Sequence, residues 1–182
     1  MDVTEKRISR EIIFEGRVFT VAKDVNELPD GRLAPREIVL HNGGAGILPI
    51  DSEGNVTLVR QYRCGVGKVY LEICAGKTEK GENPKDCAVR ELREELGLVA
   101  DTVTSLGALG ATPAYDSEII YIYLATGLTE VGQALDDGEF LEIVKMPLKE
   151  AFYMVNDGRI EDAKTQIAIL KAYTQRLLNG KD

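Results

Sequence analysis

The feature that most constrains this chain is an acid-rich segment, residues 76–98, that has the boundaries of one short helix. Asn83 followed by Pro84 is typical of a helix start, because asparagine caps free N–H groups and proline tolerates the first helical position. Gly97 is typical of a helix end. The pattern therefore predicts a single helix between these residues.

Three glutamates share one face of this predicted helix. Glu91, Glu94 and Glu95 stand at positions i, i+3 and i+4. Like charges at this spacing destabilise a helix by about 0.2–0.5 kcal/mol per pair, and acids near the last turn oppose the helix dipole. A bound cation removes both objections, and carboxylate oxygens suit Mg²⁺ or Mn²⁺. We expect a divalent-metal site here; the alternative is an ordinary solvated acidic helix.

The same segment carries a complete family signature. It follows the pattern Gly-x5-Glu-x7-Arg-Glu-U-x-Glu-Glu-x-Gly-U, where U is aliphatic, from Gly76 to Leu98. In this the chain resembles the Nudix hydrolases, with no mismatch at any defined position. The resemblance implies an α/β fold, a Nudix α/β/α sandwich with a mixed sheet, and metal-dependent hydrolysis of a diphosphate linkage.

The resemblance also implies how a metal is held. Glu91 and Glu95 are expected as principal ligands, Glu94 as a third ligand, and the carbonyl of Ala75 as a further one. The expected cofactor is Mg²⁺ or Mn²⁺, with about two or three ions per site.

The remaining signature residues are expected to support the scaffold. Glu82 in the loop and Arg90 on the helix can pair and hold the loop against the metal face. Direct catalysis by this pair is the alternative. Gly76 and Gly97 are expected to serve backbone geometry.

The rest of the chain predicts strands interleaved with a few helices. The expected strands are 8–14, 18–25, 33–40, 45–50, 56–62, 69–74, 103–110, 118–125 and 141–147, and the closing helices are 149–156 and roughly 161–178. This order favours a mixed sheet with helices packed on it. A glycine-rich stretch after residue 40 suggests two parts. Residues 1–42 would form a small antiparallel β-meander, for dimerisation or substrate binding, and residues 43–182 the catalytic domain.

Composition disfavours a nucleic-acid or membrane-surface binder. The net charge is 22 − 30 = −8, and no basic stripe is present. No apolar run approaches the length of a membrane span. The three cysteines lack CxxC spacing, which favours reduced thiols and a cytoplasmic protein.

Outside the signature the chain resembles the ADP-ribose pyrophosphatase branch of the family. Pro113 lies 15 residues after Leu98, where that branch carries a proline marker, although Thr-Pro-Ala replaces the usual Ser-Pro-Gly. Arginine binds phosphate in a fork, and a solvated strand-edge arginine is the alternative. The resulting candidate substrate-binding residues are Arg36, Glu37, Arg63, Pro113 and Glu118. The Asp162–Thr165 segment at the start of the last helix also resembles bacterial members.

The catalytic base is expected outside the signature. The branch places it on a late acidic loop, which corresponds here to residues 136–139. Glu139 is the first candidate and Asp137 the second, and Glu94 within the signature is a further candidate. A solvated turn is the alternative for this loop.

The expected substrate is ADP-ribose or a related nucleoside diphosphate sugar, cleaved to a nucleoside monophosphate and a sugar phosphate. Alternatives are a GDP-mannose type of hydrolase, a sanitiser of oxidised nucleotides, and a non-catalytic nucleotide-sugar sensor. The N-terminal meander is too small to be stable alone and needs apolar cover for Ile12, Phe14, Val18 and Val21. In similar proteins a second subunit supplies that cover, so a homodimer is expected.

Overall fold

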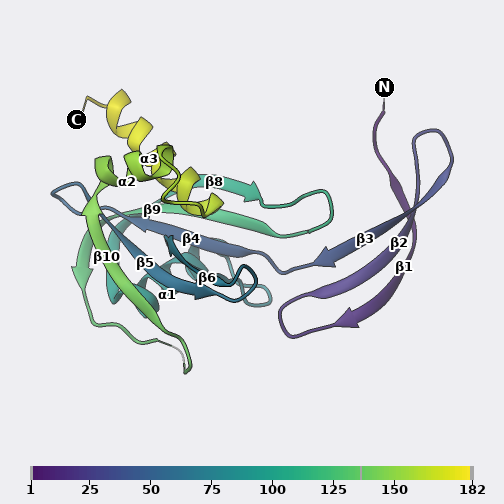
Figure 1. The fold of residues 1–182 in the computed structure, drawn as a ribbon, viewed down its shortest axis with the longest axis horizontal. Helices are drawn as coiled ribbons and strands as arrows, with labels where there is room; N and C mark the ends of the chain where they lie inside the picture. Colours follow the sequence, from purple (N-terminus) through teal and green to yellow (C-terminus); the bar gives the residue numbers. More distant parts are fainter. Residues whose placement is uncertain (1, 136, 181–182) are drawn as a thin grey trace. The chain divides into compact units, whose positions relative to one another are not determined.

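The structure is a computed structural model that describes residues 2–135 and 137–180. Its chain forms two compact units, one of Met1–Gly43 with Gly110–Ile119 and one of Gly44–Leu109 with Ile120–Asp182. The elements other than β7 are labelled in Figure 1. In chain order, the elements are β1 (Lys6–Glu15), β2 (Thr20–Glu27), β3 (Leu33–Leu40), β4 (Gly44–Pro49), β5 (Asn55–Arg63), β6 (Lys68–Glu72), β7 (Cys74–Lys77), α1 (Pro84–Leu96), β8 (Leu98–Gly110), β9 (Ile119–Glu130), β10 (Leu141–Pro147), α2 (Leu148–Asn156) and α3 (Ala163–Leu178).

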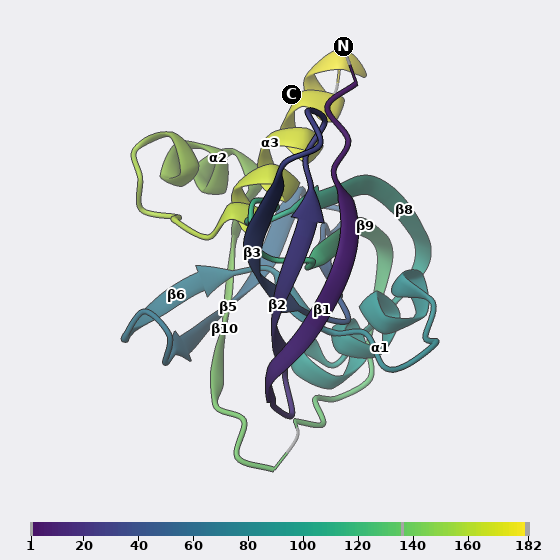
Figure 2. The same cartoon turned by 90° about the vertical axis from the view of Figure 1, so that its right-hand side faces the viewer.

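The first unit is built on an antiparallel sheet in the order β1-β2-β3 (Figure 2). Gly31, with φ of 84°, closes the turn between β2 and β3, where its N–H donates to the carbonyl of Leu28. The segment 110–119 is hydrogen-bonded to strand β3, where the N–H of Val39 donates to the carbonyl of Tyr115 at 2.7 Å. Strand β1 is exposed along its whole length.

The second unit contains two sheets. One is mixed and has the order β7-β4-β9-β8, with β4 parallel to β9 and antiparallel to β7. The other is antiparallel and has the order β10-β5-β6. The mixed sheet and the separate N-terminal antiparallel sheet confirm the predicted α/β class.

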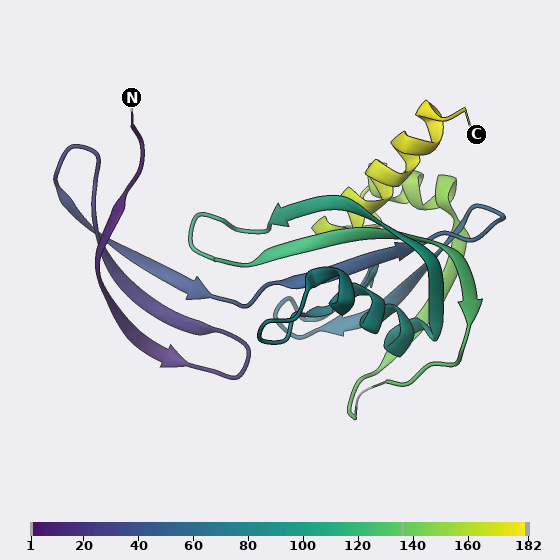
Figure 3. The ribbon, with the colours of Figure 1, turned by 180° about the vertical axis from the view of Figure 1, so that it is seen from behind.

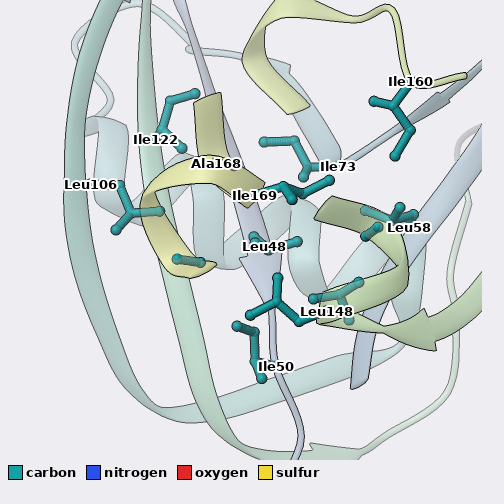
Figure 4. Close-up of a cluster of buried hydrophobic side chains, with 13 residues drawn as sticks. Leu48, Ile50, Leu58, Ile73, Leu106, Ile122, Leu148, Ile160, Ala168 and Ile169 are labelled. Atoms are coloured by element: carbon teal, nitrogen blue, oxygen red, sulfur yellow. The ribbon is translucent and has the colours of Figure 1, made fainter. Parts of the chain in front are cut away.

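Helices pack on both faces of the mixed sheet. Alternate residues of β4 point to opposite sides, as a pleated strand requires, so Ile47 joins one buried cluster and Leu48 another. Helix α1 packs on the Ile47 side through Ala88 and Leu92. Figure 3 shows this helix in front of the sheet. Helices α2 and α3 pack on the Leu48 side, where Ile169 lies among the buried side chains of Figure 4. The result is an α/β/α arrangement.

Strand bounds follow the sequence prediction at β3 and β10 and differ elsewhere. The strand expected at 69–74 is divided into β6 and β7, which belong to different sheets. The break falls at buried Ile73, whose N–H donates to the hydroxyl of Thr165 at 2.8 Å instead of to a neighbouring strand. Strand β8 begins at Leu98, directly after Gly97, rather than at residue 103.

Candidate active site

Helix α1 forms as its capping residues predict. The side chain of Asn83 accepts a hydrogen bond from the backbone N–H of Lys85, and Pro84 occupies the first turn. Gly97 ends the helix with φ of 63°, a left-handed conformation that glycine adopts without strain. Because Ala88 and Leu92 are fully buried, the helix is fixed in rotation about its axis. That rotation sets where its glutamates point.

The three glutamates of α1 lie in different environments. Glu95 is buried, with 2% of its surface exposed, whereas the side chain of Glu94 is 36% exposed. Glu91 lies between these extremes. Burial, followed by the charges of Glu91 and Glu139, raises the pKa of Glu95 to about 8. Within the described residues, Oε2 of Glu95 has no hydrogen-bond partner. A buried carboxyl group with an unpaired oxygen is costly unless it binds a proton or a cation.

Arg90 acts as an internal counter-ion that the sequence argument did not include. Its Nη1 donates to Glu91 at 2.6 Å and to Glu94 at 3.0 Å. Its Nε donates to Glu82 at 3.1 Å, and Glu82 in turn accepts a hydrogen bond from the N–H of Glu79. The predicted Glu82–Arg90 pair is therefore present, and hydrogen bonds from Arg90 lower the pKa of Glu82. Arg90 therefore offsets part of the repulsion between the glutamates, an effect that the sequence argument gave to a bound metal alone.

Strand β7 lies directly against this carboxylate face. A Cβ atom added to Gly76 would lie 1.8 Å from Oε1 of Glu91, so only glycine allows the glutamate to occupy its position. A backbone hydrogen bond from Ala75 opposes the rise in the pKa of Glu95. Ala75 and Gly76 are thus adjacent to the two glutamates expected to bind metal.

The donor set fits a divalent cation. It offers hard carboxylate oxygens, including the unpaired Oε2 of Glu95, and a glycine that leaves room at Glu91. Among residues 2–135 and 137–180, no three histidine, cysteine, aspartate or glutamate side chains are already grouped to hold a metal. The guanidinium of Arg90 is bonded to Glu91 and Glu94 instead.

The segment after β9 is tied to the end of α1. The N–H of Ala134 donates to the carbonyl of Glu94 at 3.0 Å, and the side chain of Gln133 donates to the carbonyl of Glu95 at 2.5 Å. The N–H of Val131 donates to the carbonyl of Gly97. These donors satisfy carbonyls that a helix terminus leaves unpaired. They also bring the chain that leads to the acidic loop beside the glutamates.

Glu139 lies within electrostatic range of Glu91 and Glu95. Gln61 of β5 donates to Oε1 of Glu139 at 3.3 Å, and the charge of Glu139 raises the pKa of both Glu91 and Glu95. Asp137 is exposed in the preceding turn. Asp136, the first acid of the predicted loop, lies outside the described residues.

The candidate substrate-binding residues divide between the two units. Arg63 lies in the unit that holds the glutamates; it pairs with Glu72, and its charge lowers the pKa of Glu95. The other four lie in the first unit. Arg36 pairs with Glu5 at 2.5 Å, Glu37 is exposed on β3, Pro113 lies in a turn, and Glu118 is 3.3 Å from His41. Arg36 is therefore ion-paired, and its side chain is still 36% exposed.

The sequence analysis missed the buried partner of Arg63, Glu72, and the second cation that Glu72 contacts. Glu72 is almost fully buried, and it contacts both Arg63 and Lys164. The available signal was Glu72 itself, a charged residue at the end of an apolar strand. It did not reveal which cations would pair with it, because Lys164 is far away in sequence.

Comparison with known proteins decides the family. The profile of the NUDIX domain matches residues 40–167. The chain belongs to the Nudix family. Similar proteins include the methanol dehydrogenase activator of Bacillus methanolicus, 40% identical over 97% of each chain. The ADP-ribose pyrophosphatase of Bacillus subtilis (strain 168) is 39% identical over 91% of this chain and 90% of its own.

A solved structure supports the same fold. The crystal structure of an ADP compounds hydrolase superposes with a TM-score of 0.86 over the whole of both chains, at 23% identity. The resemblance to Nudix hydrolases and the α/β fold it implied are thus confirmed. In the part of the chain that the structure describes, none of the helices combines the length and apolar character needed to cross a membrane.

Proposed function

We propose that this Nudix enzyme hydrolyses the diphosphate linkage of ADP-ribose or a related nucleoside diphosphate sugar. The products would be AMP, or another nucleoside monophosphate, and a sugar phosphate. One observation carries the proposal: Glu95 of α1 is buried beside Glu91, and its Oε2 has no hydrogen-bond partner among the described residues, which a bound divalent cation would supply. The likeness to an ADP-ribose pyrophosphatase over most of both chains supports the substrate class.

The carboxylate face would hold the metal. Glu91 and Glu95 are the principal proposed ligands, with Glu94 and the carbonyl of Ala75 completing the set. Bound Mg²⁺ or Mn²⁺ would neutralise the diphosphate and lower the pKa of an attacking water. Arg90 must release Glu91 and Glu94, at least in part, and its bond to Glu82 gives the guanidinium a second anchor when it does so.

The other side chains would position and activate the reactants. Glu139 is the proposed general base, which accepts the proton of the attacking water at its carboxylate. Gln61 holds that carboxylate through a hydrogen bond of 3.3 Å to Oε1. Asp137 and Glu94 are the alternative bases. Arg63 would bind the diphosphate through its Nη1 end, since Glu72 uses only the Nε–Nη2 edge.

The first unit is the proposed dimerisation and substrate-binding part. Its sheet leaves large apolar side chains uncovered, with Ile8 and Ile12 each 50% exposed and Phe14 54% exposed. Three strands alone bury too little apolar surface to be stable, so a second copy is the cover we propose. Arg36, Glu37, Pro113 and Glu118 remain its candidate substrate contacts. We place the homodimer in the cytoplasm, where its free thiols would stay reduced.

A second candidate function is the regulation of a partner enzyme. Its support is the 40% identity to a methanol dehydrogenase activator over 97% of both chains. The two functions separate experimentally. An activator that works by hydrolysis would lose its effect in the Glu95→Gln variant, whereas one that works by binding would keep it.

A substrate panel tests the main proposal. We would assay ADP-ribose, ADP-glucose, GDP-mannose, NADH and a diadenosine polyphosphate, each with Mg²⁺ and with Mn²⁺, and compare kcat/KM. ADP-ribose or another ADP-sugar should give the highest value, and chelation with EDTA should abolish turnover. Preference for GDP-mannose would favour the alternative type of hydrolase. No turnover of any of these compounds would refute the proposal.

A further inference from the structure

Arg63 is held by a buried carboxylate. Its Nε and Nη2 donate to the two oxygens of Glu72 at 2.8 and 2.9 Å, a two-pronged contact that fixes the guanidinium plane. Glu72 lies at the end of β6 and is 1% exposed, whereas the side chain of Arg63 is 40% exposed. The pair therefore anchors Arg63 on its buried side and leaves its other side open.

Glu72 has a second cation on the side away from solvent. Lys164, at the start of α3, donates through Nζ to Oε2 of Glu72, the oxygen that also accepts from Nη2 of Arg63. Lys164 is itself 8% exposed, which is unusual for lysine. Asp162 accepts a further contact from its ammonium group at 3.0 Å.

The backbone that carries Lys164 is locked in place. Asp162 caps α3 by accepting hydrogen bonds from the N–H and the hydroxyl of Thr165. The hydroxyl of Thr165 in turn accepts from the N–H of Ile73, the residue after Glu72. The lysine and the glutamate it contacts are thus joined twice, through their side chains and through the Thr165–Ile73 hydrogen bond.

This arrangement does more than neutralise a buried charge. Arg63 alone would neutralise Glu72, and burying a second cation carries a desolvation cost of its own. The added contact restricts rotation of the Glu72 carboxylate, and that carboxylate sets the plane of Arg63. Arg63 lies close enough to Glu95 for each charge to affect the pKa of the other. Its orientation is therefore set beside the proposed metal face.

We propose that Lys164 is a positioning residue for diphosphate binding, acting through Glu72 to aim the Nη1 end of Arg63 at the substrate. The inference rests on the proposed function and adds a specific residue of the last helix to it. Lys164 itself is buried behind Glu72 and does not touch the substrate. A merely structural lysine would stabilise the fold without affecting how tightly the diphosphate binds.

The test is a double-mutant cycle between Lys164→Met and Arg63→Met, with steady-state kinetics on ADP-ribose and Mg²⁺. Lys164→Met should raise KM on the order of tenfold and change kcat by less than about threefold, since the contact is made equally in the ground and transition states. In the Arg63→Met background, the same lysine substitution should leave KM unchanged. Lys171→Met is the matched control, because Lys171 lies on the same helix and donates to the carbonyl of Leu106 instead.

The outcomes separate the two proposals. A wild-type protein that turns over no nucleoside diphosphate sugar refutes the proposed function, and the inference falls with it. If wild type is active, the inference alone is overturned by an unchanged KM in Lys164→Met, or by an equal rise in KM with and without Arg63. Should Lys164→Met fail to fold, Lys164→Leu, which also removes the donor to Glu72, is judged by the same values of KM.

Discussion

Gly76 and Glu91 lie so close together that a Cβ atom on the glycine would sit 1.8 Å from Oε1 of the glutamate. Gly76→Ala must therefore displace the side chain of Glu91 or move β7 away from α1. Because displacement of a reacting group by about 1 Å can cost about a hundredfold in rate, we expect kcat to fall by that factor or more. Kinetics with ADP-ribose at saturating Mg²⁺ would measure it.

Gly65→Ala is the control for that substitution. A Cβ atom on Gly65 would meet nothing within 4 Å, so the change should leave kcat and stability close to wild type. If Gly76→Ala were as active as Gly65→Ala, the carboxylate of Glu91 would not need its present position.

Glu95→Gln should abolish metal-dependent turnover and leave the fold intact. The substitution keeps the shape of the buried side chain and removes the negative charge that a divalent ion needs. Circular dichroism would check the fold, and an assay of AMP formation from ADP-ribose would measure the activity. Glu142→Gln is a suitable control, because Glu142 is an exposed glutamate on β10. Near-normal turnover in Glu95→Gln would remove Glu95 from the metal site.

Glu139→Gln should lower kcat by about a hundredfold or more with little change in metal affinity, as expected for loss of a general base. Asp137→Asn is the comparison, and we expect a much smaller effect from it. The pair of variants is measured by single-turnover kinetics and by Mn²⁺ titration. A loss of about tenfold or less in Glu139→Gln would point to Asp137 or Glu94 as the base.

Asp51 should contribute to stability in a defined acid range. Burial alone would raise its pKa, but hydrogen bonds from Lys145 and Asn55 outweigh burial and lower the pKa from 3.8 to about 2. Its contribution is fully present above pH 3.8 and is lost as the pH falls toward 2, since the unfolded state then binds a proton first. We expect the Tm of Asp51→Asn, measured by thermal unfolding at a series of pH values, to fall less steeply than that of wild type between pH 3.8 and 2.

Asp157→Asn provides the comparison for that measurement. Asp157 pairs with a cation as Asp51 does, in this case Arg159, but both side chains are largely exposed, and solvent screens such pairs. The substitution Asp157→Asn should change the dependence of Tm on pH below 3.8 less than the substitution Asp51→Asn does. Equal curves for the two variants would contradict the role given to Asp51.

The proposed dimer predicts a response to charge on β1. The double substitution Ile8→Lys with Ile12→Lys places two lysines on the uncovered apolar surface, and we expect it to convert a dimer to a monomer in light scattering. Val66→Lys, at an exposed turn of the other unit, should leave the mass unchanged. A wild-type monomer would contradict the proposal outright.

Local signals in the sequence were sufficient for α1. Its capping residues act within a few positions of one another, so Asn83, Pro84 and Gly97 could be interpreted without knowledge of the rest of the chain. Strands β3 and β10 were equally predictable from their apolar patterns. The family signature likewise lies within one continuous segment.

Contacts between residues far apart in the chain could not be predicted from the sequence. The break between β6 and β7 depends on Thr165, which lies 92 residues from Ile73, and nothing in the local pattern marks it. The pairing of Arg36 with Glu5, 31 residues away, was equally hidden in the sequence. The choice of partner among many charged residues is made by the tertiary fold, so a charge pattern could not reveal it.

The hydrogen bond between Thr165 and Ile73 has a consequence for shortened forms of the protein. It joins α3, the last element of the chain, to the strand end beside Arg63. A premature stop codon or a proteolytic cut before Thr165 would leave every residue of the signature in place. Such a truncated chain would still be recognised as a family member, yet it would lack the contacts that hold Glu72, the carboxylate that fixes Arg63.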